Sequence, residues 1–273
     1  MRNVAIYHCS IRIIGRSKGR SAVAYAAYCS GTKLYDKEVR KTYNYTGQNS
    51  VVHSEINLPQ NAPSEFYDRE KLWNAVHEIE TRSDAQLARE VEVALPREFI
   101  RQEQIDTVRE YVMNNFVHKG MCADWALHDK GDGNPHAHIM LTTRAFTRNG
   151  KWADKQKSIY KLDKNGQKIP AIDPTTGQQK IGARGRKMWQ RETVQANDWN
   201  DRSKAEEWRA AWAAECNRRL DRQHQIDHRS YARQAVEREP TIHEGYAARK
   251  MEREGLVSDR CEINREIREL NEQ

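Results

Sequence analysis

The chain has 273 residues, enough for one large domain or two small ones. Its 46 lysines and arginines outnumber its 39 aspartates and glutamates, and the net charge of +7 favours a polyanionic partner. No apolar run is long enough to span a membrane and the first residues do not resemble a secretory signal, so we expect neither membrane insertion nor export. The five cysteines form no CxxC pair, which argues against a disulfide framework and favours a reducing cytoplasm.

Strand and helix patterns alternate along the first half of the chain. Ser21 is a suitable helix cap and Gly31 a suitable helix end, so a short alanine-rich helix is expected between them. In a later segment Val91, Val93 and Leu95 share one face, as in a strand packed on a core. In chain order we predict a strand at 3–14, a helix at 22–30, a strand at 51–59, a helix from Asp68, a strand at 87–96, a helix at 101–119 and strands at 122–128 and 136–143.

The second half is more charged. Turn signals within 151–187 predict a protruding basic β-hairpin, and a helix at 203–222 and a charged C-terminal helix follow. The order of elements predicts an α+β fold with a central, mostly antiparallel sheet flanked by helices. We expect a catalytic domain at 1–200 that includes the hairpin, and a helical extension at 201–273 that packs on it or follows it.

Positive charge is concentrated in residues 144–191, which hold 13 lysines or arginines against three aspartates. Trp152, Tyr160 and Trp189 are interleaved with these cations. Cations that neutralise phosphates, mixed with rings that stack on bases, are typical of a nucleic-acid groove. A solvated loop is the alternative interpretation.

Three histidines give the sharpest signal. His136 and His138 lie two residues apart and therefore point to one face of a strand, while a neighbouring antiparallel strand ends at His128. Three neutral imidazoles around one ion leave coordination positions open, as a catalytic metal site requires. Ligand preferences favour Zn²⁺ or Ni²⁺, whereas phosphate oxygens in the shell suit Mn²⁺ or Mg²⁺. Surface histidines in a polar hairpin are the alternative, and His8 is a candidate neighbour if the first strand lies centrally.

A metal beside a basic groove suggests phosphodiester chemistry with water or a side chain as nucleophile. Tyr25 and Tyr28 lie three residues apart on the short helix and so lie near one face. A tyrosine nucleophile would conserve the energy of the broken bond in a phosphotyrosine. From spacing alone, either ring is also consistent with core packing.

Several motifs carry a family resemblance. They are IYH at 6–8, SAVAYAAY at 21–28, REKLWNAVHEIETR at 69–82, AREVEVALP at 88–96, the histidine motif at 128–138, and the later WRAAWAAECN, DHRSY and EPTIHEG. In this order, over about residues 1–250, the chain resembles the MobA/MobL family of conjugative relaxases within the HUH endonucleases. The resemblance implies a central antiparallel sheet, one divalent metal ion held by three histidines, and strand-specific nicking at an origin of transfer through a 5′-phosphotyrosine.

The resemblance also implies roles for single residues. By position, the nucleophile is Tyr28 and the metal ligands are the three histidines. The family's carboxylate falls on Glu90, with Glu92 as the competing choice, and Arg82 matches a basic position suited to contact the phosphate. The cations expected to hold single-stranded DNA and its adjoining hairpin are Arg16, Lys18, Arg20, Lys151, Lys155, Lys157, Arg184, Arg186 and Lys187.

The function predicted from the sequence is that of a bacterial, cytoplasmic DNA relaxase with Mn²⁺ or Mg²⁺ as the expected ion. Its expected partners are the nic-site DNA, a coupling protein and the accessory proteins of a relaxosome. The alternatives are a rolling-circle replication initiator or transposase with the same chemistry, and a non-catalytic nucleic-acid-binding protein that contains a metal.

Overall fold

The computed structural model describes residues 7–131, 133–242 and 244–272, and the chain divides after Ile226 into two compact units. The expected boundary at residue 200 lies earlier in the chain. The helix that follows it, α4 (Ser203–Asn217), belongs to the first unit because Trp208 and Trp212 are buried in that unit's core. Two tryptophans therefore place α4 with the sheet rather than with the C-terminal helices.

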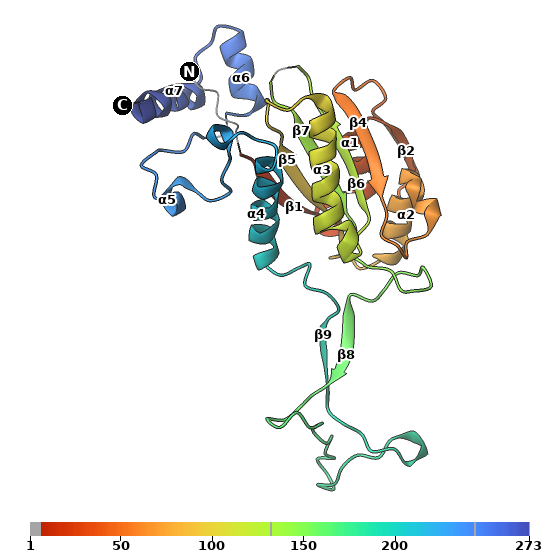
Figure 1. The fold of residues 1–273 in the computed structure, drawn as a ribbon. Coiled ribbons are helices and arrows are strands. Elements are labelled where there is room, and N and C mark those ends of the chain that lie inside the picture. The colour runs from red at the N-terminus through yellow and green to blue at the C-terminus, as the bar shows by residue number, and fades with distance from the viewer. Residues whose placement is uncertain (1–6, 132, 243, 273) are drawn as a thin grey trace. The chain divides into compact units, whose positions relative to one another are not determined.

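A five-stranded antiparallel sheet forms the centre of the first unit, with the order β1-β5-β7-β6-β4 (Figure 1). The α+β fold with a central antiparallel sheet is therefore confirmed. Its strands are β1 (Cys9–Gly15), β4 (Val51–Asn57), β5 (Gln86–Ala94), β6 (Ala123–His128) and β7 (His136–Leu141). The condition under which His8 would neighbour the site, a central first strand, is not met: among the described residues β1 pairs only with β5 and lies at one edge of the sheet.

Helices cover both faces of this sheet (Figure 1). On one face lie α1 (Ala22–Ser30) and α2 (Arg69–Ile79), and on the other lie α3 (Arg101–Asn115) and α4. Each face of the sheet packs against its helices in a separate hydrophobic core, and alternate residues of a strand contribute to different cores. Val91 and Val93 face α3 and α4, whereas Ala88 and Met140 face α1 and α2.

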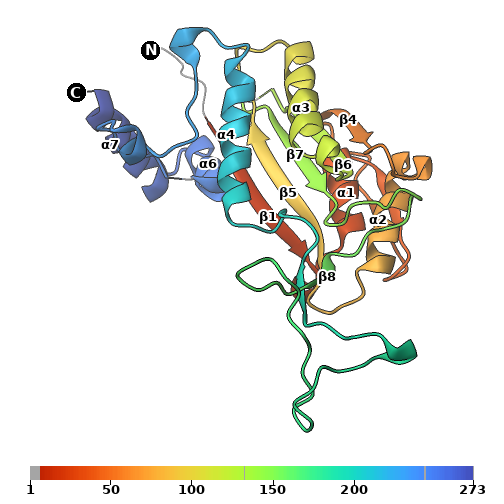
Figure 2. The ribbon, with the colours of Figure 1, turned by 60° about the horizontal axis from the view of Figure 1, so that its bottom comes forward.

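Two short antiparallel pairs complete the first unit. The pair of β2 (Lys33–Asp36) and β3 (Lys41–Asn44) follows α1 and was not predicted. The pair of β8 (Gln156–Tyr160) and β9 (Arg191–Gln195) confirms the basic hairpin, although β9 lies beyond its predicted end at 187. This ribbon leads away from the sheet in both views (Figures 1 and 2). At its base the buried Glu80 accepts from Arg144 Nε (2.7 Å) and Lys155 Nζ (2.8 Å), which ties the ribbon to the end of α2.

The second unit contains α5 (Tyr231–Gln234), α6 (Gly245–Arg253) and α7 (Asp259–Glu272), where the sequence predicted a single charged C-terminal helix. The buried Asn264 on α7 fastens the segment before α6, because its amide donates to the Ile242 carbonyl (2.8 Å) and to Glu244 (2.9 Å). Within the described residues of both units, every helix is too short or too polar to cross a membrane.

Candidate active site

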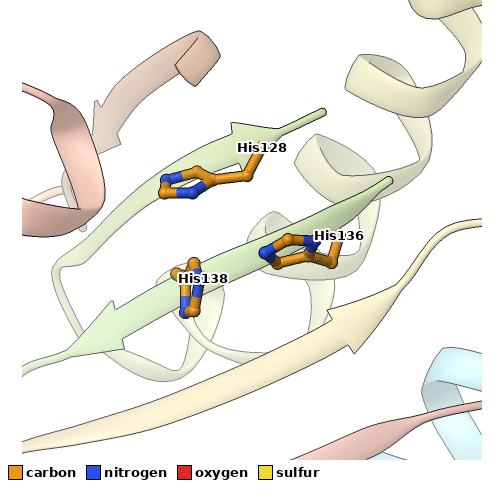
Figure 3. Close-up of side chains that lie close together, drawn as sticks. All are labelled: His128, His136 and His138. Atoms are coloured by element: carbon orange, nitrogen blue, oxygen red, sulfur yellow. The ribbon is translucent and has the colours of Figure 1, made fainter. Parts of the chain in front are cut away.

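The three histidines meet on the face of the sheet that α1 covers (Figure 3). His128 ends β6 directly opposite His136, which begins β7, and His138 follows two residues later on the same face. Their ring centroids are 4.9 to 5.5 Å apart. One ring nitrogen of each lies within 4.8 Å of those of the other two. The turn between the strands needs Gly131 and Gly133, both of which have positive φ (72° and 76°).

Each imidazole is oriented by an oxygen acceptor. His128 Nε2 donates to the Cys29 carbonyl (2.6 Å), His136 Nδ1 to the Asn134 carbonyl (2.9 Å) and His138 Nδ1 to Glu90 Oε1 (3.0 Å). A neutral histidine that donates through one nitrogen carries its lone pair on the other. Metal-ligating histidines in proteins are typically held in this way. The donor set therefore fits one divalent cation.

Glu90 links the histidines to α1. This buried carboxylate also accepts a hydrogen bond from the Tyr25 hydroxyl, and Arg12 Nη1 lies 3.8 Å from its second oxygen. Burial acts to raise the pKa of Glu90, but the hydrogen bonds from His138 and Tyr25 outweigh burial, so its pKa lies below the ordinary value. Glu90 is therefore a carboxylate at neutral pH. Glu92 on the same face instead pairs with Arg12 (2.9 Å).

The two tyrosines of α1 occupy different environments. Tyr25 is partly buried, and its hydroxyl is committed to Glu90. Tyr28 is 39% exposed, and its ring centroid lies 6.3 Å from those of both His128 and His138. Of the two phenols, Tyr28 combines access from solvent with proximity to the histidines.

The pKa values of both phenols are raised. For Tyr25 burial is the main cause, followed by the charges of Cys29 and Glu90, so it remains protonated. For Tyr28 burial again raises the pKa most, and Cys29, Glu92 and Glu90 add to it. The protein alone therefore disfavours the Tyr28 phenolate. A cation nearby would offset this effect.

Two candidate residues, Arg82 and His8, lie away from the histidines. Arg82 precedes the start of β5 and pairs in solvent with Asp84 (2.9 Å). The residue of β5 that faces His138 is Glu92, near the other end of the strand. His8 is exposed beside the edge strand β1, and the cluster of potential ligands among the described residues does not include it. Neither side chain takes part in the site as it stands.

The candidate DNA-binding cations fall into two groups. Arg16 turns inward and donates to the carbonyls of Glu80 (2.6 Å) and His77 (2.8 Å), so it closes the end of α2. Lys155 is held by Glu80 at the base of the ribbon. The exposed candidates are Lys18, Arg20, Lys151, Lys157, Arg184, Arg186 and Lys187.

Sequence reasoning missed Arg12, which lies opposite Glu90 across the β1–β5 pair and forms ion pairs with both Glu90 and Glu92. The alternation of β1 places Arg12 on one definite face, but only the register of β1 against β5 shows that this face is the site's. The sequence also could not predict that the Cys29 carbonyl accepts a hydrogen bond from His128, because any residue type at position 29 would supply the same backbone oxygen.

We predict a pH dependence of stability from His128, whose pKa is lowered to about 4, first by burial and then by the neighbouring His138, His136 and Lys130. Because the folded-state pKa lies below the ordinary value, the unfolded chain binds this proton first. This contribution to stability is complete above about pH 6.5 and is lost as the pH falls towards 4. The metal-free protein should lose about 2 kcal/mol through this group between pH 7 and 5.

Urea unfolding in chelator at several pH values measures this loss. His128→Gln cannot take up the proton, so its unfolding free energy should depend less on pH by that amount. Equal pH dependence of the two proteins would contradict the assignment.

Comparisons with known proteins agree with this architecture. A model described as the MobA/MobL family matches residues 20–254. The "Probable mobilization protein MobA" of Bifidobacterium longum (strain NCC 2705) is 43% identical over 98% of this chain and 48% of its own length. The "Conjugal transfer protein TraA" of Agrobacterium fabrum (strain C58 / ATCC 33970) is 36% identical over 98% of this chain and 24% of its own length. The chain thus spans about half of the first relative and about a quarter of the second.

A solved structure shares the fold. It is titled "Molecular Basis of Vancomycin Resistance Transfer in Staphylococcus aureus" and aligns with a TM-score of 0.65 and 28% identity, over 83% of this chain and 100% of that chain. The aligned part of this chain is longer than the five strands of the central sheet together.

Proposed function

Since the chain belongs to the MobA/MobL family, we propose that it nicks one strand of plasmid or mobile-element DNA at an origin of transfer and later rejoins it. The observation that carries this proposal is the position of Tyr28, a partly exposed phenol whose ring lies 6.3 Å from those of two clustered histidines. The names of the relatives, which concern mobilization and conjugal transfer, support the same substrate. We further propose that it acts in the bacterial cytoplasm with a coupling protein and relaxosome accessory proteins.

The proposed reaction is a transesterification. The Tyr28 phenol oxygen attacks the scissile phosphorus, the bond from phosphorus to the 3′ oxygen breaks, and the DNA keeps a free 3′-hydroxyl while its 5′ phosphate is bound to Tyr28. The phenol proton is transferred, directly or through solvent, to the leaving 3′ oxygen. Rejoining is the reverse reaction, in which the 3′-hydroxyl displaces Tyr28.

The residues around Tyr28 would orient the histidines and balance charge near the phosphate. Glu90 holds His138 in one orientation and accepts the hydrogen bond of the Tyr25 hydroxyl, which commits that hydroxyl away from the phosphate. Arg12 offsets the charge of Glu92, which lessens the repulsion of an incoming phosphate. A divalent ion on the three histidines, Mn²⁺ or Mg²⁺ with Zn²⁺ and Ni²⁺ as alternatives, would stabilise the negative charge that develops on the phosphate.

Relaxation of a supercoiled plasmid that carries the cognate origin tests the proposal. With a divalent ion, the protein should convert supercoiled DNA to open circles that remain linked to it in SDS, and sequencing of the 5′ end would map the nick. A protein that binds the origin in the presence of each of the four ions, but leaves the plasmid supercoiled and unlinked, would be a non-catalytic DNA-binding protein.

A second prediction concerns the basic ribbon. If its exposed cations bind phosphates, replacing Lys157, Arg184, Arg186 and Lys187 by glutamine should weaken binding of single-stranded DNA. Each lost contact should reduce the slope of log affinity against log salt by about 0.7, close to 3 for all four. Titrations of a labelled oligonucleotide at several salt concentrations measure this slope.

The control exchanges lysine and arginine at the same four positions. It keeps the charges and should keep the slope. If the glutamine variant also keeps the wild-type slope, the ribbon does not bind the DNA backbone.

A further inference from the structure

The unpredicted β2–β3 hairpin lies beside the proposed nucleophile. Gly31 ends α1 in the left-handed region (φ 63°), and an added Cβ there would lie 3.0 Å from Val51 Cγ2. The chain therefore turns sharply at this glycine. Directly after it, the Thr32 carbonyl accepts a hydrogen bond from the Tyr45 amide (3.1 Å), which brings the end of the hairpin back to the end of α1.

This return places a third phenol, that of Tyr45, next to Tyr28. The ring of Tyr45 meets that of Tyr28 edge to face, with centroids 5.6 Å apart and an interplanar angle of 83°. Tyr45 is 37% exposed, which is close to the exposure of Tyr28. Aromatic rings in soluble proteins are usually covered, so two adjacent rings open to solvent offer a surface for a flat partner.

The charges of the hairpin favour an anionic partner. Lys33, Arg40 and Lys41 are exposed. Of the two acids of the hairpin, Asp36 is buried and accepts from Ser21 (2.5 Å), while Glu38 is exposed but paired with Arg16 and His77. The solvent side of the hairpin therefore presents more positive than negative charge.

We propose that Tyr45 stacks on a nucleobase next to the scissile phosphate, so that the β2–β3 hairpin forms a second single-strand-binding surface apart from the basic ribbon. This inference rests on the proposed function, because it takes Tyr28 as the residue that the phosphate must reach. A base stacked on Tyr45 fixes the nucleotide attached to it. The edge contact between the two rings then sets the distance from that nucleotide to Tyr28. Stacking tolerates any base, so the subsite contributes affinity and position rather than sequence readout.

The experiment uses a single-stranded oligonucleotide of the cognate origin, with 2-aminopurine replacing one base at a time along it. The protein carries Tyr28→Phe so that the DNA stays intact. At one of these positions binding should quench the fluorescence through stacking. Adding Tyr45→Leu should abolish that quenching and weaken binding about tenfold, whereas Tyr45→Phe, which keeps the ring, should preserve both.

Tyr35→Leu is the matched control. Tyr35 lies on the same hairpin and is 40% exposed, but its side is the opposite one: Tyr35 and Thr42 pair on one face of the β2–β3 hairpin, and Leu34 and Tyr43 pair on the other. Its removal should leave quenching and affinity unchanged. The inference is overturned if Tyr45→Leu keeps full quenching at every position, or if Tyr35→Leu loses as much as Tyr45→Leu. Failure of the proposed function is a separate result, because the protein with Tyr28 intact would then leave the same oligonucleotide uncut.

Discussion

Tyr28→Phe should bind its DNA as the wild type does and form no SDS-resistant adduct with it. The substitution removes one oxygen and keeps the ring, so the edge contact with Tyr45 and the packing of α1 remain. Without that oxygen the phosphotyrosine cannot form, and nicking should fall by about a thousandfold or more. Gel mobility in SDS reports the adduct, and binding of the uncleaved oligonucleotide reports affinity.

Tyr25→Phe is the matched control on the same helix. It also keeps the ring, but it removes the hydrogen bond to Glu90, so we expect the adduct to form at a rate reduced by no more than about tenfold. Loss of the adduct in Tyr25→Phe with its survival in Tyr28→Phe would identify Tyr25 as the nucleophile. Survival in each single variant and loss in the double variant would show that the two phenols can replace one another.

His136→Ala should abolish nicking while DNA affinity changes little. Removing one imidazole leaves two of three ligands, and the lost charge stabilisation is worth several kcal/mol, or about a thousandfold in rate. Binding depends mainly on cations elsewhere in the chain, so it should persist. Nicking rates and oligonucleotide affinities, measured over a range of Mn²⁺ concentrations, separate the two effects.

His53→Ala is the control for loss of a histidine. His53 lies on β4, where it pairs with Glu55 (2.9 Å) and packs on Trp125, and the ligand cluster does not include it. This variant should nick at close to the wild-type rate. Nicking by the wild type at full rate in excess chelator would contradict a metal-dependent reaction.

The histidine cluster was predictable because its geometry is local. His136 and His138 share a face by strand alternation alone, and a short turn brings His128 opposite His136. The helix of Tyr25 and Tyr28 was equally readable, since a serine cap and a terminal glycine mark its two ends. Both features depend on neighbours in sequence rather than on the arrangement of distant segments.

The features that the sequence did not predict depend on contacts between distant segments. Alternation in β1 did not reveal that the strand lies at the edge, and so it left open whether His8 neighbours the site. Nothing in the sequence around Arg16 shows that it would bind the carbonyls at the end of α2 instead of facing DNA. The β2–β3 hairpin escaped notice because its strands are four residues each, too short for a clear period.

The hydrogen bond from His128 to the Cys29 carbonyl connects a proposed metal ligand to the backbone of the helix that carries Tyr28. Occupation of the proposed metal site and placement of the proposed nucleophile should therefore be energetically coupled, although they are usually considered separately. Thermodynamic reciprocity then applies: whatever the ion contributes to holding α1 in position, α1 contributes to holding the ion. If Tyr28 is joined to DNA as proposed, a pull on that strand would be transmitted to the same hydrogen bond, so mechanical load and metal affinity would become linked variables.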